Sequence, residues 1–181
     1  QLPKLGLLQD EPMKKHTTFR IGGPADYYAE PDMSRISKLI EIAKACDMPI
    51  TVIGNGSNLL VGDKGIRGLV IGIGKGLSEI EVTEAVAQQS TAQDVLIDAT
   101  VLTAEGELKT VTRDELDLSY RHSIVPEKGY IVLSARFRLT PKPKDEIKSY
   151  MAELRTKRVE KQPLEYPSAG STFKRPEGYF A

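Results

Sequence analysis

A short run of β-branched residues leads directly into a glycine-rich turn in the first half of the chain. Residues 50–53 (Ile-Thr-Val-Ile) predict a buried strand, and residues 54–58 (Gly-Asn-Gly-Ser-Asn) follow it at once. Two glycines one residue apart let the backbone approach a ligand and present its N–H groups, while Ser57 and Asn58 add side-chain donors. The turn suits a pyrophosphate, although an ordinary tight turn explains the spacing equally well. It is neither a Walker loop nor a complete Gly-x-Gly-x-x-Gly motif.

Helices and strands are predicted in a mixed order. Residues 31–46 carry apolar side chains at helical spacing, and a second helix is expected from Pro143 to about Glu160. The expected strands cover residues 50–53, 59–61, 66–73, 95–102, 108–111 and 131–139. Because they do not alternate strictly with helices, the sequence predicts an α+β fold rather than a doubly wound sheet.

Side-chain spacing also predicts which faces are apolar. On the strand at 131–139, one face carries Ile131, Leu133, Ala135, Phe137 and Leu139. On the helix after Pro143, one face carries Ile147, Tyr150, Met151 and Leu154. We therefore expect each of these elements to present an apolar face.

Composition excludes several classes of protein. The 181 residues include 25 Lys and Arg against 25 Asp and Glu, so the balanced charge disfavours nucleic-acid binding and leaves only local basic patches open. No stretch is apolar enough to cross a bilayer, and no secretion signal is expected. Cys46 is the single cysteine, which excludes an internal disulfide, and no Cys/His cluster predicts a metal site. We expect a cytoplasmic protein in which Ala43 and Met48 pack around the Cys46 thiol.

Three further segments could carry chemistry. Residues 17–25 hold two glycines before a proline, and together with residues 54–58 they favour a dinucleotide ligand. In residues 120–123 (Tyr-Arg-His-Ser), the Tyr-Arg pair could hold a carboxylate, although a surface ion pair is the simpler interpretation. In residues 167–176, a serine hydroxyl could donate a proton, although a polar turn is the simpler interpretation. No His/Asp pair accompanies that serine, which disfavours a hydrolase.

Taken in order, four segments resemble the UDP-N-acetylenolpyruvoylglucosamine reductases, the MurB family of bacterial peptidoglycan synthesis. The matching segments are residues 16–26 (HTTFRIGGPAD), 54–61 (GNGSNLLV), 120–123 (YRHS) and 161–171 (KQPLEYPSAGS). Four motifs in the family's order are far more specific than any one of them. The uninterrupted Tyr-Arg-x-Ser form and the Lys-Gln-Pro-Leu-Glu-Tyr-Pro run look like the shorter type II branch.

The resemblance implies an FAD-binding fold of the PCMH/MurB type followed by a substrate-binding domain. We expect residues 1–70 to form the first FAD-binding subdomain, residues 71–140 the second, and residues 141–181 the start of the substrate-binding domain. The implied activity is the NADPH-dependent reduction of UDP-N-acetylglucosamine enolpyruvate to UDP-N-acetylmuramate through bound FAD. The implied partner is this small nucleotide sugar; the oligomeric state stays open, and a monomer is compatible with the sequence.

The resemblance also assigns roles to single residues. Ser171 would donate a proton to the substrate carbon, and Arg121 would stabilise the negative charge that gathers on the substrate carboxylate. Tyr120 and Lys161 would contact the substrate, Lys161 near its phosphates. The expected FAD-binding residues are Gly54, Asn55, Gly56, Ser57, Asn58, Ile21, Gly22 and Gly23.

The chain departs from the family at two places. Family members carry a long glycine-rich segment that helps bind flavin and substrate, and only residues 74–94 stand in its place. The chain ends at Ala181, where the third domain of the family continues, and the family's catalytic glutamate has no counterpart. Either the sequence joins the ordered parts of a longer chain, or the chain is a truncated and inactive form. The intact flanking motifs favour the first explanation.

Two other functions stay open at the level of sequence. Another oxidoreductase on the same FAD fold would keep residues 54–58 but would not require Arg121 and Ser171 together. A non-catalytic flavin- or nucleotide-binding module would have lost its substrate domain.

Overall fold

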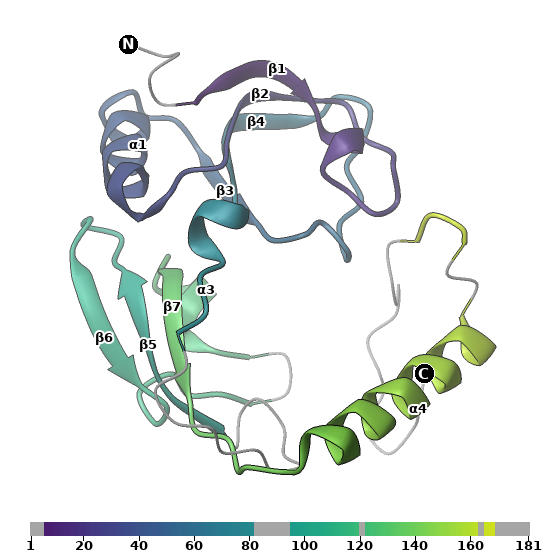
Figure 1. Ribbon diagram of the computed structural model, residues 1–181. Helices are drawn as coiled ribbons and strands as arrows, with labels where there is room; N and C mark the ends of the chain where they lie inside the picture. Colours follow the sequence, from purple (N-terminus) through teal and green to yellow (C-terminus); the bar gives the residue numbers. More distant parts are fainter. Residues whose placement is uncertain (1–5, 82–94, 120–121, 163–164, 169–181) are drawn as a thin grey trace. The chain divides into compact units, whose positions relative to one another are not determined.

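The computed structural model describes residues 6–81, 95–119, 122–162 and 165–168. The chain divides into two compact units, Gln1–Ser78 with Pro163–Ala181 and Glu79–Gln162 (Figure 1). Each unit combines a β-sheet with helical segments, so the predicted α+β class is confirmed. The subdomain boundaries expected from the resemblance stay predictions.

A four-stranded sheet forms the centre of the first unit. Its strands lie in the order β1 (Leu8–Pro12), β2 (Pro24–Ala29), β4 (Ile66–Gly72) and β3 (Ile50–Ile53). The first pair, β1 and β2, is antiparallel, whereas β4 runs parallel to both β2 and β3 (Figure 1). The carboxyl ends of β2, β3 and β4 therefore lie at the same edge of the sheet.

The helix α1 (Met33–Ala45) connects two of these parallel strands, β2 and β3. It begins after Asp32, whose carboxylate accepts hydrogen bonds from the backbone N–H groups of Ser34 and Arg35. Such an N-cap satisfies backbone donors that have no partner within the helix. The helix buries Ile36, Leu39, Ile40 and Ala43, as the helical spacing predicts.

Two local predictions in this unit are wrong. The thiol of Cys46 is exposed because this residue caps the carboxyl end of α1, beyond the buried face of the helix. Residues 59–61 form a loop rather than a strand. Val61 is nevertheless buried, and the next carbonyl, of Gly62, accepts a hydrogen bond from the backbone N–H of Gly23 at 3.1 Å. In this loop Val61 belongs to the core and Leu59 packs against it, whereas Leu60 is exposed.

Short helical segments and a small core complete the first unit. The 3₁₀ turns are η2 (Met13–Lys15) and η3 (Lys75–Leu77). The buried cluster between the sheet and its loops consists of Met13, Ala25, Tyr28, Ile53, Val61 and Val70. This cluster comes from five separate stretches of sequence, so it holds the loops that follow β1 and β3 against the sheet.

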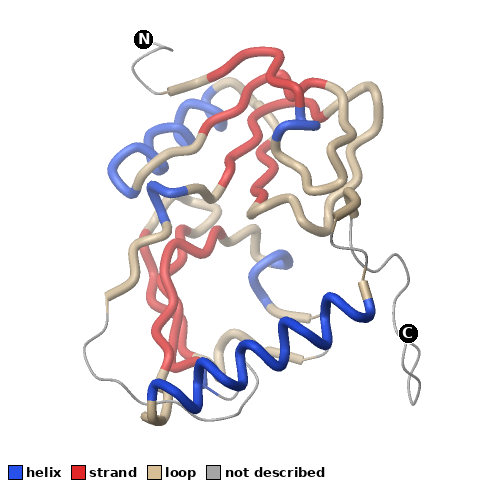
Figure 2. Tube along the Cα trace, turned by 45° about the vertical axis from the view of Figure 1, so that its right-hand side comes forward, coloured by secondary structure: helices blue, strands red, loops and turns tan. Residues whose placement is uncertain are grey.

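The second unit contains a three-stranded antiparallel sheet in the order β6 (Leu108–Thr112), β5 (Leu96–Leu102), β7 (Ile131–Phe137) (Figure 2). The predicted hairpin of β5 and β6 is confirmed. In its turn, the buried hydroxyl of Thr103 accepts hydrogen bonds from the backbone N–H groups of Glu105 and Glu107. The core of the unit contains Ala99, Val101, Val111 and Leu116.

The predicted apolar faces of the second unit are only partly buried. On β7, Leu133 is buried, but Phe137 is exposed and the strand ends there. A register shift between β5 and β7 at Thr100/Val101 interrupts the alternation of side chains. The short helix α3 (Ile124–Glu127) precedes β7, and α4 (Lys144–Lys161) follows it with no buried residue. None of the helices among the described residues has the length and apolar character that crossing a membrane requires.

Candidate functional site

A pocket of about 290 Å³ lies at the carboxyl edge of the parallel strands of the first unit. Its lining comes from the ends of β2, β3 and β4 and from the loop after η2: Lys15, His16, Thr17, Thr18, Tyr28, Glu30, Gly54, Asn55, Gly72, Ile73 and Gly74. Ligands of open sheets with parallel strands bind at this edge, because loops there diverge and backbone groups are left free. Of the sequence-predicted cofactor residues, Gly54 and Asn55 line the pocket.

The glycines of residues 54–58 serve two different purposes. A Cβ atom at Gly54 would meet no atom within 4 Å, so the backbone here borders open space. Gly56 has a φ of +60°, and a Cβ atom there would lie 2.0 Å from the carbonyl oxygen of His16. The Gly56 carbonyl also accepts a hydrogen bond from the backbone N–H of Thr18 at 3.2 Å. Gly54 thus gives a ligand access, whereas Gly56 joins this loop to residues 16–18.

A second glycine pair, Gly72 and Gly74, lies at the carboxyl end of β4 and was not among the predicted site residues. A Cβ atom at Gly72 would lie 2.3 Å from the Tyr28 hydroxyl, and one at Gly74 would lie 2.6 Å from Oε2 of Glu30. The polar ends of Tyr28 and Glu30 thus occupy the space that side chains at Gly72 and Gly74 would need. The available signal was the Gly-x-Gly spacing of residues 72–74 at the end of the strand predicted over residues 66–73.

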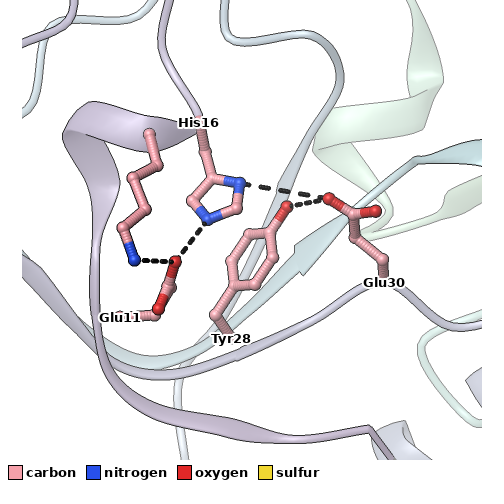
Figure 3. A network of polar contacts seen from close by, with 5 residues as sticks. Glu11, His16, Tyr28 and Glu30 are labelled. Carbon is pink, nitrogen blue, oxygen red and sulfur yellow. Dashed lines mark hydrogen bonds and ion pairs between the residues drawn. The ribbon is translucent and has the colours of Figure 1, made fainter.

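The polar side chains at the pocket form one connected network (Figure 3). The Tyr28 hydroxyl donates to Oε1 of Glu30 at 2.6 Å, and the His16 ring stacks on Tyr28 with centroids 3.9 Å apart. His16 Nε2 lies 3.0 Å from a carboxylate oxygen of Glu11, which also accepts from Lys15. Burial and then the Glu30 carboxylate raise the pKa of the Tyr28 hydroxyl, so Tyr28 stays a proton donor to Glu30.

The predicted residues of the 17–25 segment lie against a neighbouring loop. A Cβ atom at Gly22, where φ is +145°, would meet Val61 at 2.9 Å, and one at Gly23 would meet the Asp63 carbonyl at 2.0 Å. Ile21 is 47% exposed. Ile21, Gly22 and Gly23 are not part of the pocket lining, and the same is true of Gly56, Ser57 and Asn58. Their cofactor-binding role stays a prediction.

One hydrogen bond joins two of the sequence motifs that are far apart in the chain. The Thr18 hydroxyl donates to the carbonyl oxygen of Ser168 at 2.6 Å. Thr18 lines the pocket, and Ser168 lies three residues before Ser171 in the motif at 161–171. Ser171 itself lies outside the described residues. The contact nevertheless brings the segment that leads to Ser171 to the loop beside the pocket.

The other residues predicted to contact the substrate are Tyr120, Arg121 and Lys161. Tyr120 and Arg121 lie outside the described residues. Lys161 is the last residue of α4 and is exposed. His122, which follows Arg121 in the sequence, lies 3.1 Å from a carboxylate oxygen of Asp117 and 3.3 Å from one of Glu127.

The chain is an α+β protein with a pocket at the carboxyl ends of parallel strands, the edge at which proteins with open parallel sheets bind nucleotide cofactors. The chain is 74% identical to the UDP-N-acetylenolpyruvoylglucosamine reductase of Agathobacter rectalis, in an alignment that covers 100% of this chain and 75% of that protein. The chain belongs to the UDP-N-acetylenolpyruvoylglucosamine reductase family. The family and the oxidoreductase class implied by the motifs are thereby confirmed.

Two further comparisons agree. The reductase of the same name from Oceanobacillus iheyensis is 38% identical, with 97% of this chain and 71% of that protein covered. The crystal structure of UDP-N-acetylenolpyruvylglucosamine reductase (MurB) from Thermus caldophilus matches with a TM-score of 0.71 and 28% identity, covering 97% of this chain and 76% of that one. It confirms the predicted MurB-type fold. No family model matches the chain.

The alignment with the Agathobacter rectalis protein spans 236 positions, whereas the chain has 181 residues. That relative therefore carries residues within the matched region that have no counterpart here.

Proposed function

We propose that this chain reduces the enolpyruvyl group of UDP-N-acetylglucosamine enolpyruvate to give UDP-N-acetylmuramate, with FAD as the bound cofactor and NADPH as the cosubstrate. The observation that supports this most directly is the hydrogen bond between Thr18 and Ser168. It ties the motif that contains the expected proton donor to the loop that lines the expected cofactor pocket. The names of the relatives supply the substrate.

The residues at the pocket fit the ADP half of FAD. Backbone at Gly54 borders open space, so a pyrophosphate can reach its N–H group and those that follow. A volume of about 290 Å³ is close to the lower limit of ligand pockets, ~300 Å³, and suits part of a dinucleotide. Residues 54–55 and 72–74 would hold this half of the cofactor. When bound, FAD supplies the chemistry of hydride transfer.

The chain's own residues supply substrate binding and proton transfer. Arg121, which is always charged, would hold the substrate carboxylate and stabilise the negative charge that accumulates there as the double bond is reduced. Ser171 would then donate its hydroxyl proton to the carbon that has become basic. Tyr120 would orient the substrate, and Lys161 would bind its phosphates. These roles are carried over from the motifs that match the family.

We place the reaction in the cytoplasm, where a single unpaired cysteine stays reduced. The exposed thiol of Cys46 is compatible with this compartment. Because the proposed substrate is a nucleotide sugar, we expect this small molecule as the partner of the protein, and no nucleic acid or membrane.

A non-catalytic cofactor-binding module is the second candidate function. It is favoured by one observation, that the alignment with the Agathobacter rectalis relative contains positions that this chain lacks. If those positions are needed for hydride transfer but not for cofactor binding, the chain would retain FAD without reducing the substrate.

Absorption spectroscopy tests the proposal. The chain is incubated with excess FAD, gel-filtered, and then exposed to NADPH without oxygen. We expect a flavin band that elutes with the protein, bleaches with NADPH and recovers when UDP-N-acetylglucosamine enolpyruvate is added. A colourless protein would exclude FAD binding, and a bleached band that does not recover would favour the non-catalytic module.

The role of Ser171 is tested by Ser171→Ala in the same assay. We expect bleaching by NADPH to persist while recovery on substrate addition slows by at least about 100-fold, as is typical for the loss of a proton donor. Ser149→Ala, at an exposed position of α4, is the control. Equal loss of both half-reactions would contradict the assignment.

A further inference from the structure

Glu30 has one carboxylate oxygen bound by its neighbours and one left for a ligand. It follows β2 directly, lines the pocket, and its side chain is 49% exposed. Its Oε1 atom accepts from the Tyr28 hydroxyl at 2.6 Å and lies 3.9 Å from Nδ1 of His16. Among the described parts of the chain, no hydrogen bond or ion pair to Oε2 is present. Oε2 can therefore accept hydrogen bonds from a molecule in the pocket.

The position of this oxygen is set by the surrounding network (Figure 3). Tyr28 is 4% exposed, so its hydroxyl holds Oε1 in a defined place. The ring of His16 stacks on Tyr28 and is itself held by Glu11 at 3.0 Å. On the other side, the lack of a side chain at Gly74 leaves room for Oε2, because a Cβ atom would lie 2.6 Å away. Such a preorganised acceptor loses little entropy when a ligand binds.

The chemistry of a carboxylate limits which part of a nucleotide can bind beside it. A carboxylate accepts hydrogen bonds from hydroxyl groups and repels phosphates. In dinucleotide-binding folds, an acidic residue that follows a parallel strand accepts the 2′-hydroxyl of the ribose, and a 2′-phosphate requires a cation there instead. Glu30 likewise follows a parallel strand, β2, and lines the pocket, although here it precedes the glycine turn of residues 54–58 in the chain.

We propose that Glu30 recognises the ribose of the cofactor's ADP half and excludes nucleotides that carry a 2′-phosphate from this pocket. The inference rests on the proposed function, since it takes the ADP half of FAD as the occupant. It adds a reason why the pocket accepts FAD and rejects NADPH, whose adenosine ribose carries a 2′-phosphate. Glu30 is a specificity-determining residue here and takes no part in hydride transfer.

Calorimetric titration with ADP, 2′-deoxy-ADP and 2′-phospho-ADP tests this without any flavin chemistry. We expect the chain to bind ADP about tenfold more tightly than either analogue, as the loss of a hydrogen bond to a charged group predicts. In Glu30→Gln, the affinity for ADP should fall about tenfold, and 2′-deoxy-ADP should bind as well as ADP does. The penalty for a 2′-phosphate should shrink because the repelling charge is gone.

The control is Glu41→Gln, which removes a carboxylate from the exposed face of α1, away from the pocket. It should bind all three nucleotides like the unsubstituted chain, and thermal unfolding of both variants checks that they are folded. The analogues test the same contact in the unsubstituted chain. The inference can therefore be tested even if Glu30→Gln does not fold.

Two results would overturn the inference. One is equal affinity of the unsubstituted chain for ADP and 2′-phospho-ADP, and the other is no binding of ADP at millimolar concentration. If FAD nevertheless coelutes with the protein, the proposed function stands and only the role of Glu30 fails. If ADP binding depends on Glu30 but no flavin is retained, the contact of Glu30 with an ADP ribose stands, whereas FAD as the occupant and the proposed function fail.

Discussion

Arg136 on β7 lies directly opposite Asp98 on β5, and its guanidinium binds both carboxylate oxygens of Asp98. Nε of Arg136 donates to Oδ1 at 2.8 Å, and Nη2 of the same guanidinium donates to Oδ2. The carboxylate is 9% exposed, whereas the arginine is mostly exposed. This pair joins the central strand of the second sheet to one of its edges.

The Asp98–Arg136 pair should make stability depend on pH. The hydrogen bond from Arg136 holds the pKa of Asp98 below its ordinary value, so the folded state binds this proton less readily than the unfolded state does. The pair therefore stabilises the fold at pH values above about 3.9, the pKa of an aspartate in the unfolded chain. This stabilisation is lost as the pH falls through the lower pKa that Asp98 has in the folded state. When the pH is lowered from neutral to strongly acidic, the free energy of unfolding should fall less in Asp98→Asn than in the unsubstituted chain.

Urea unfolding at a series of pH values measures this difference. Arg136→Gln removes the cause of the shift and should flatten the dependence on pH in the same way. If the free energy of unfolding depends on pH identically in all three proteins, the pair does not affect the titration of Asp98.

The contact between Thr18 and Ser168 should matter for catalysis more than for folding. Thr18→Val keeps the shape of the side chain but removes the hydroxyl that donates to the Ser168 carbonyl. We expect a loss of about 0.5–1.5 kcal/mol from this bond and a slower transfer to substrate, with bleaching by NADPH retained. Stopped-flow absorbance measures both half-reactions. Thr110→Val, on an exposed position of β6, is the control. A normal transfer rate in Thr18→Val would exclude this role of the contact.

Gly56 should tolerate no side chain. Gly56→Ala places a Cβ atom 2.0 Å from the His16 carbonyl oxygen on a backbone with φ of +60°. A strained backbone of this kind costs about 1–3 kcal/mol, and relief of the overlap would separate residues 54–58 from residues 16–18. We expect a clear drop in the melting temperature. Gly54→Ala is the matched comparison, because its Cβ atom would meet no atom within 4 Å and its melting temperature should be nearly unchanged. Equal melting temperatures for the two variants would contradict this account.

The turn between β5 and β6 should depend on the Thr103 hydroxyl. Thr103→Val keeps the branched shape but leaves the backbone N–H groups of Glu105 and Glu107 without this acceptor. Each hydrogen bond contributes about 0.5–1.5 kcal/mol net, so the loss of these two bonds should lower the free energy of unfolding by about 1–3 kcal/mol. Urea denaturation measures it, with Thr110→Val as the control in the same hairpin. A loss no larger than that of the control would show that water replaces the bond.

Local patterns in the sequence determined much of the secondary structure. The N-cap and apolar spacing of α1, the β-branched run of β3, and the alternation around the turn of the β5–β6 hairpin all depend on residues close together in the chain. Glycine spacing also predicted that residues 54–58 form a turn, and Gly54 and Asn55 of this turn line the pocket. The four motifs, taken in order, identified the family because each is an uninterrupted run of residues.

Only the tertiary structure decided which side chains meet at the pocket. Parallel pairing of β2 with β4 places Tyr28 and Glu30 against Gly72 and Gly74, although more than forty residues separate the two segments in the sequence. The contact of Thr18 with Ser168 spans 150 residues. Local propensities carry no information about such contacts, since they depend on how whole elements pack. The same packing decided that residues 59–61 form a loop, because Val61 is buried there without pairing in the sheet.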